Sequence, residues 1–147
     1  MEIIKQQITI ADSCNLIGKS KDTFSPLKEA ITNSLDAISQ RQKFDESFAA
    51  DVIVNVHFKT TINILKEEKT VLDFISVEDN GIGFTSENLE NFKNFGSKSK
   101  GLNNRGTGKI QIFWQFNEIS IDSIFCENFK WHKLTAHLKQ TGEYEEN

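Results

Sequence analysis

The segment 25–41 constrains the fold most, because it predicts an amphipathic helix with reactive groups along one face. Its Ser-Pro start is favourable, with the serine as N-cap and the proline as the first helical residue. Glu29, Asn33 and Asp36 follow at i, i+4 and i+7, so at about 100° per residue they lie within roughly 60° of one another. The opposite face is apolar and can bury against a sheet: Leu27, Ile31, Leu35 and Ile38.

The polar face of this helix combines two carboxylates with an amide. A carboxylate can activate water, and an amide oxygen is a hard ligand that suits magnesium. The alternative is a surface helix whose polar face meets only water, since most amphipathic helices carry no chemistry.

A second motif, Asp79-Asn-Gly-Ile-Gly83, follows the apolar run 71–77, whose alternation predicts a half-buried strand. Asparagine and glycine tolerate positive φ, and two glycines let a ligand approach the backbone. A carboxylate at the strand end is a good acceptor for an exocyclic amino group such as that of adenine. The alternative is an ordinary turn out of a strand.

The segment 95–109 is rich in glycine, basic residues and amides, and the apolar run 110–116 follows it. Its Gly-Thr-Gly end is expected to lead into a helix whose free N–H groups and positive dipole end suit a phosphate. The segment is not a Walker A loop, which would need glycine where Asn103 stands and serine or threonine where Ile110 stands. A flexible basic loop is the alternative.

In this order and spacing, the three motifs resemble those of the GHKL ATPase superfamily: the gyrase B subunit, the heat-shock chaperones of the ninety-kilodalton class, histidine kinases and MutL. Residues 29–37 are similar to the N-box, residues 79–83 to the adenine-binding box, and residues 96–108 to the ATP lid with its second glycine box. The resemblance covers about residues 25–116 and is closest in motif to MutL- and MORC-like members. It implies an α+β fold, a Bergerat-type ATP-binding sandwich with a mixed, mainly antiparallel sheet and helices on one face.

The resemblance implies a role for each polar residue of the N-box. Glu29 is the general base that orients and deprotonates the attacking water. Asn33 is the ligand of a magnesium ion that bridges the phosphates. Asp36 belongs to the nucleotide-binding set, where it orders water or a lid residue.

The other two boxes are expected to contact the nucleotide. Asp79 accepts a hydrogen bond from the adenine amino group, and Gly83 leaves room for the base. The remaining nucleotide-binding residues implied by the resemblance are Gly81 in the adenine box, Lys100 and Arg105 in the lid, and Gly106, Thr107 and Gly108 at the phosphates.

These roles imply an ATPase that uses Mg²⁺ with ATP as substrate, and whose nucleotide state drives dimerisation or a conformational change in a larger protein. A homodimer through the N-terminal segment is a further implication, because this end often crosses to a partner subunit in relatives. The N-box glutamate argues against a histidine kinase, since phosphotransfer to histidine needs no hydrolytic base.

Two departures from the family pattern favour an alternative, a nucleotide-binding or protein-interaction module that does not hydrolyse ATP. Relatives continue with a Gly-Thr strand beneath the adenine, whereas no Gly-Thr pair follows the lid here. The relatives nearest in motif also carry a second domain that sends a lysine to the γ-phosphate, and 147 residues leave no room for it. We therefore expect the N-terminal part of a longer protein, whose pathway could be repair, silencing, chaperoning or defence.

The composition agrees with one ATP-binding domain over residues 1–147. Hydrophobic residues make up 37% of the chain and include 12 Phe, enough for a sizeable core. The net charge of −4 gives no general attraction to nucleic acid, so such contacts would need other domains. Cys14 and Cys126 are too few for a disulfide framework, and no apolar run reaches the ~20 residues of a membrane span, so we expect a cytoplasmic protein without membrane contact.

Periodicity places the remaining elements. His132 and His137 lie on one expected strand but face opposite sides, so a zinc site with Cys126 is not expected. The aromatic residues after the lid are expected in the core: Phe113, Trp114 and Phe116. Strands are expected at 2–10, 51–60, 69–79, 118–125 and 130–139, helices at 11–20 and 86–95, and a polar end without a strand at 140–147.

Overall fold

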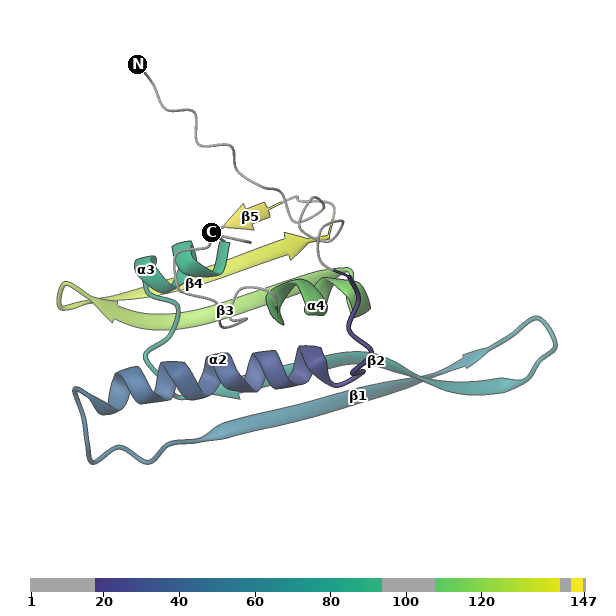
Figure 1. Cartoon of the computed structure of the whole chain (residues 1–147), viewed down its shortest axis with the longest axis horizontal. Helices are drawn as coiled ribbons and strands as arrows, with labels where there is room; N and C mark the ends of the chain where they lie inside the picture. Colours follow the sequence, from purple (N-terminus) through teal and green to yellow (C-terminus); the bar gives the residue numbers. More distant parts are fainter. Residues whose placement is uncertain (1–17, 94–107, 141–143, 147) are drawn as a thin grey trace, which may run out of the picture. The chain divides into compact units, whose positions relative to one another are not determined.

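The computed structural model describes residues 18–93, 108–140 and 144–146 (Figure 1). The chain divides into two compact units. One contains Met1–Glu29 and Ile82–Asn147, and the other contains Ala30–Gly81. Helix α2, Ser25–Gln42, begins in the first unit and ends in the second.

The first unit contains two helices and a three-stranded sheet: α3 (Ser86–Lys93), α4 (Gly108–Gln115), β3 (Glu118–Glu127), β4 (Lys130–Lys139) and β5 (Tyr144–Glu146). The strands are antiparallel in the order β3-β4-β5. Burial alternates along β3 and the second half of β4, as expected for a sheet with one covered face. Ile110 and Phe113 of α4 are 0% and 1% exposed and form one core with Phe92 of α3, Ile121 of β3 and Ala136 of β4. Trp114 packs against this core, so the expected core position is confirmed for Phe113 and Trp114, whereas Phe116, after the end of α4, is half-buried.

The second unit joins the greater part of α2 to a long antiparallel hairpin of β1 (Val52–Ile62) and β2 (Glu68–Asp79). The first residue of β1 pairs with the last residue of β2. The register shifts between His57 and Phe58, where a bulge interrupts the ladder. Both strands run longer than the sequence pattern predicts, because hydrogen bonds of the ladder continue through polar residues near the turn.

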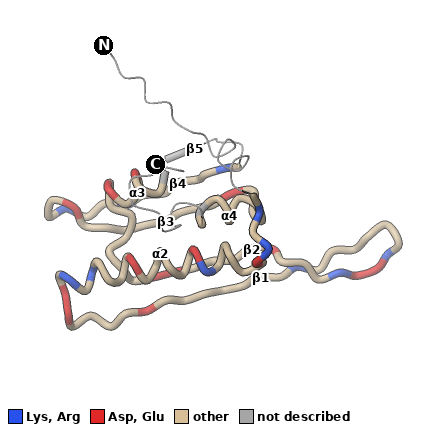
Figure 2. Tube along the Cα trace, viewed as in Figure 1, with Lys and Arg blue, Asp and Glu red and all other residues tan. Residues whose placement is uncertain are grey.

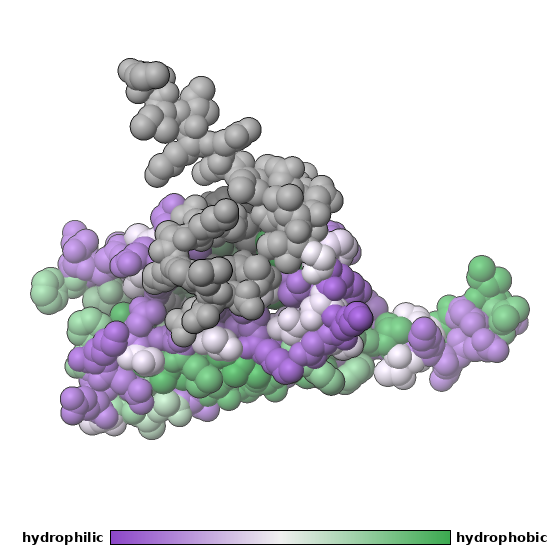
Figure 3. Space-filling model, in the orientation of Figure 1, coloured by the Kyte–Doolittle hydropathy of each residue, from purple (hydrophilic) through white to green (hydrophobic). Residues whose placement is uncertain are grey.

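The turn of this hairpin is built around Asn63. Its Oδ1 accepts hydrogen bonds from the N–H groups of Leu65 and Glu67, each at 2.9 Å. Ile64 and Leu65 are 101% and 77% exposed at the turn. Figure 3 shows this apolar surface at the outer end of the hairpin, and Figure 2 shows charges of both signs beside it.

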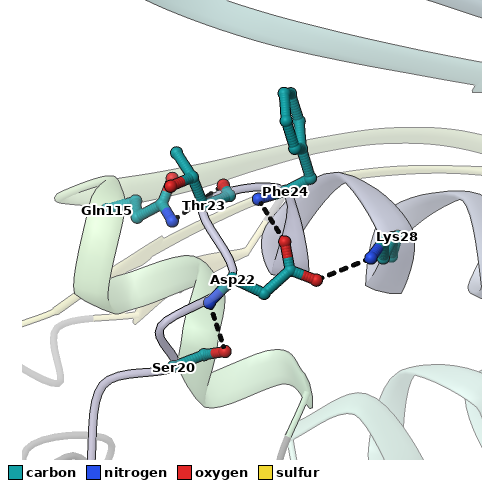
Figure 4. Close-up of polar contacts among 6 residues, drawn as sticks. All are labelled: Ser20, Asp22, Thr23, Phe24, Lys28 and Gln115. Carbon is teal, nitrogen blue, oxygen red and sulfur yellow. Dashed lines mark hydrogen bonds and ion pairs between the residues drawn. The ribbon is translucent and has the colours of Figure 1, made fainter.

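The N-cap of α2 lies one residue earlier in the chain than the sequence predicts. The N–H of Lys28 donates to the carbonyl of Phe24 at 2.9 Å, so Phe24 rather than Ser25 occupies the N-cap position. Asp22 supports this end, because its Oδ1 accepts from the N–H of Phe24 at 3.0 Å and its Oδ2 from Nζ of Lys28 at 2.6 Å (Figure 4). The Lys28 bond, and after it the Phe24 bond, holds the pKa of the Asp22 carboxyl below its ordinary value of 3.8.

The predicted α+β class is confirmed. Every strand pair in the described part of the chain is antiparallel, and the strands form a two-stranded and a three-stranded sheet. The prediction of a polar end without a strand is wrong, because Tyr144–Glu146 pairs with β4. Three residues are too few to show a period of two, and such a strand depends on hydrogen bonds from its neighbour.

The buried face of α2 also differs in one position from the apolar face that the sequence predicts. Leu35 is 55% exposed, whereas Ser34 and Ile38 are each 5% exposed. The buried stripe therefore passes through Ser34, which lies one turn before Ile38. The strand expected at 2–10, and all but the end of the helix expected at 11–20, lie outside the described residues.

Candidate nucleotide-binding site

Glu29 lies against the first residue of α4. A Cβ atom built on Gly108 would overlap Oε2 of Glu29 and lie 2.5 Å from its Cδ. Both residues belong to the first unit, and Glu29 is half-buried. The first N–H groups of a helix have no partner within the helix, and its dipole is positive at this end. The carboxylate expected to act as general base therefore lies beside an end of α4 that can receive an anion.

Two glutamines fix α4 against the segment that leads into α2. The side chain of Gln111 accepts from the N–H of Ser20 at 2.6 Å and donates to the carbonyl of Gly18 at 2.9 Å. The side chain of Gln115 donates to the carbonyl of Thr23 at 2.9 Å (Figure 4). The four-residue spacing puts both amides on one face of α4. These contacts hold α4 along its length against residues 18–23, which supports the position of Gly108 next to Glu29.

Sequence reasoning did not identify these two glutamines as functional residues. The available signal was a pair of amides at i and i+4 inside an otherwise apolar helix. Gln111 is only 9% exposed. A buried amide needs partners, so this pattern could have indicated a polar contact with a neighbouring segment.

The first three residues of the adenine box, Asp79–Gly81, lie at the end of β2 in the second unit, whereas Gly83 belongs to the first unit. The Oδ1 atom of Asp79 accepts a hydrogen bond from the N–H of Gly81 at 2.9 Å. A Cβ atom on Gly81 would lie 2.6 Å from the carbonyl carbon of Ala37 and 2.7 Å from the N atom of Ile38. Only glycine fits this contact between backbones, so the box is seated directly on the last residue of the N-box.

Gly83 is required for a different reason. Its φ is +80°, and a Cβ atom would lie 2.7 Å from the carbonyl oxygen of Ile124 and 2.9 Å from Oγ of Ser123. That hydroxyl oxygen accepts the N–H of Phe84 at 2.8 Å. The missing side chain of Gly83 thus accommodates β3, and its role beside the base stays a prediction.

Asn33 and Asp36 lie on α2 in the second unit, Asn33 half-buried and Asp36 exposed. Asn33 follows Glu29 by one helical turn, so the two side chains leave the same face of α2. No side-chain hydrogen bond joins Asn33 to another of the described residues. An amide oxygen is an oxygen donor of the kind that magnesium accepts, and the role of Asn33 as its ligand stays a prediction.

The other expected phosphate ligands, Lys100, Arg105, Gly106 and Thr107, lie outside the described residues. Within the described ranges, no group of three or more His, Cys, Asp or Glu could hold a metal ion. Cys126 is an exposed free thiol.

The chain matches the family of histidine kinase-, DNA gyrase B- and HSP90-like ATPases over residues 22–145. Because the match covers more than half of the chain, the protein belongs to this family and carries its ATP-binding domain. Comparisons with curated proteins and with solved structures gave no match. None of the helices in the described part is long and apolar enough to cross a membrane.

Proposed function

We propose that this protein hydrolyses ATP in a magnesium-dependent reaction. The observation that carries the proposal is the contact of Glu29 with Gly108. It joins the acidic residue of the N-box to the end of the glycine box, two motifs far apart in the sequence. A general base must lie within reach of the attacking water, and the start of α4 is where the terminal phosphate would be received.

In the proposed reaction, Glu29 accepts a proton from water as the water oxygen attacks the γ-phosphorus. The bond from the γ-phosphorus to the bridging oxygen then breaks, which leaves ADP and phosphate. N–H groups at the start of α4 would donate to the phosphate oxygens and are already oriented before the reaction. Asn33 would hold magnesium, which neutralises charge on the phosphates.

Asp79 would recognise the base. Its Oδ1 already accepts from Gly81, and its Oδ2 can accept the adenine amino group. Asp36, Gly81 and Gly83 would complete the nucleotide site by the family resemblance. Lys100, Arg105, Gly106 and Thr107 would add charge and backbone donors at the phosphates.

The test is the substitution Glu29→Ala in the longest available form of the protein. ATP binding should persist, and turnover should fall at least ~100-fold, the scale of a lost general base. Glu90→Ala is the matched control, because Glu90 is an exposed glutamate on α3. Unchanged turnover in Glu29→Ala would remove the catalytic assignment. ATP binding without turnover in the wild type would instead favour the non-hydrolysing module.

We also propose that nucleotide state drives dimerisation or a conformational change of the intact protein, located in the cytoplasm. The family resemblance supports this proposal, and the N-terminal segment expected to mediate the dimer lies outside the described residues. A non-hydrolysable ATP analogue should raise the dimer fraction measured by sedimentation. An unchanged dimer fraction would count against nucleotide-driven dimerisation.

A further inference from the structure

Asn80, the second residue of the adenine box, is fully engaged by the chain itself. Its Nδ2 donates to the carbonyl of Ala49 at 2.7 Å, and its Oδ1 accepts from the N–H of Asp51 at 2.9 Å. Its own N–H donates to the carbonyl of Asp51 at 3.3 Å. The side chain therefore fastens the end of β2 to the segment that leads into β1.

Arg41 holds the same residue from α2. Its Nη1 donates to the carbonyl oxygen of Asn80 at 2.6 Å. Its guanidinium lies 4.5 Å above the centre of the Phe48 ring, which restricts its position further. The backbone of Asn80 is thus fixed on one side by the loop before β1 and on the other by the last turns of α2.

These contacts control the neighbouring carboxylate. The N–H of Gly81 orients Asp79 by donating to its Oδ1 at 2.9 Å, and Asn80 is the link between these two residues. A shift of the Asn80 backbone would move both the donor and the carboxylate it orients. Asp79 is exposed, so little packing would restrain its side chain if that hydrogen bond were lost.

We infer that Asn80 and Arg41 are positioning residues that confer base specificity by holding Asp79 in the orientation that accepts the adenine amino group. The inference rests on the proposed function, since it requires Asp79 to read the base. It predicts that losing either contact lowers the preference for adenine while the phosphate end of the site is unaffected.

The experiment compares ATP with ITP, in which a carbonyl oxygen replaces the exocyclic amino group. Calorimetry on the intact wild-type protein should show about tenfold tighter binding of ATP, the scale of one charge-assisted hydrogen bond. Asn80→Ala should reduce this ratio to about twofold or less by weakening ATP and leaving ITP nearly unchanged. Asn55→Ala is the matched control, because this exposed asparagine of β1 makes a long hydrogen bond of 3.4 Å to Ser76 Oγ, away from Asp79, and should keep the full ratio.

Arg41→Lys provides a second, milder variant in case Asn80→Ala does not fold. It keeps the positive charge above Phe48 but loses the planar donor to Asn80, so the ratio should fall at least about threefold. A full ATP preference in a folded Asn80→Ala or in Arg41→Lys would overturn the inference. A wild type that binds both nucleotides equally would overturn the role of Asp79 in the proposed function, and with it this inference. If Asn80 and Arg41 only stabilised the fold, both variants would weaken the binding of ATP and ITP equally, and that result would also overturn the inference.

Discussion

Gly108→Ala is expected to remove most ATP hydrolysis while leaving ATP binding intact. The new methyl group would overlap Glu29 Oε2 and lie 2.5 Å from Cδ and 3.2 Å from Cγ of the same side chain. Carbon atoms in contact stand about 3.5–4.0 Å apart, so the carboxylate must retreat by about 1 Å. A displacement of about 1 Å at a reacting group is enough to lower turnover about 100-fold.

The same substitution is not expected to destabilise the protein. The atoms in its way are the end of a flexible side chain, which can move without moving the backbone. Gly108 starts a helix and is not among the positive-φ residues of the described chain. Alanine favours a helix over glycine by up to about 1 kcal/mol, so the free energy of unfolding should stay equal or rise slightly.

Phosphate release at saturating ATP and magnesium, calorimetric ATP affinity and urea unfolding together test this prediction. In a Glu29→Ala background, Gly108→Ala should lower turnover no further, because the carboxylate that it displaces is gone. Gly18→Ala is the matched control, since no atom of the described residues lies within 4 Å of its added Cβ. Turnover of Gly108→Ala within about threefold of the wild type, at full ATP occupancy, would refute the placement of the base against α4.

Two further substitutions test other parts of the proposed site, and a third tests the start of α2. Asp79→Asn should weaken ATP binding by about 1–3 kcal/mol in calorimetry, and equal ATP and GTP affinity in the wild type would contradict its role as adenine reader. Asn33→Ala should lose the magnesium-dependent part of ATP binding, and an unchanged magnesium titration would exclude it as a ligand. Asp22→Asn tests how Asp22 supports the start of α2. The pKa of Asp22 is lower in the folded state than in the unfolded state. The contribution of Asp22 to the free energy of unfolding is therefore present above the unfolded pKa of 3.8 and is lost as the pH falls through the folded pKa. The urea midpoints of wild type and variant should therefore differ near neutral pH and converge in acid, whereas a constant difference would contradict the assigned cause.

The elements that carry Glu29, Asn33 and Asp79 were predictable from the sequence, but the contacts that fix these elements were not. Glu29 and Asn33 follow a helical period, and Asp79 ends an alternating strand, so local patterns place them. Gln111 and Arg41 act through backbone groups that lie far away in the sequence. Backbone donors and acceptors carry no side-chain signature, so a tertiary contact of this kind cannot be read from residue types alone.

The residues of the N-box on α2 fall into two groups, those with a proposed chemical role and those whose size matters for packing. The proposed roles of Glu29 and Asn33 depend on their functional groups, whereas Ala37 matters through its size, because a Cβ added to Gly81 would lie 2.7 Å from the Cβ of Ala37. Ser34, at 5% exposure, is a small residue on the buried stripe. A larger residue at 37 would push the adenine box away from α2 and disturb base recognition without touching a ligand. A substitution there would therefore resemble the loss of Asp79 in its effect on ATP affinity, although it removes no polar group.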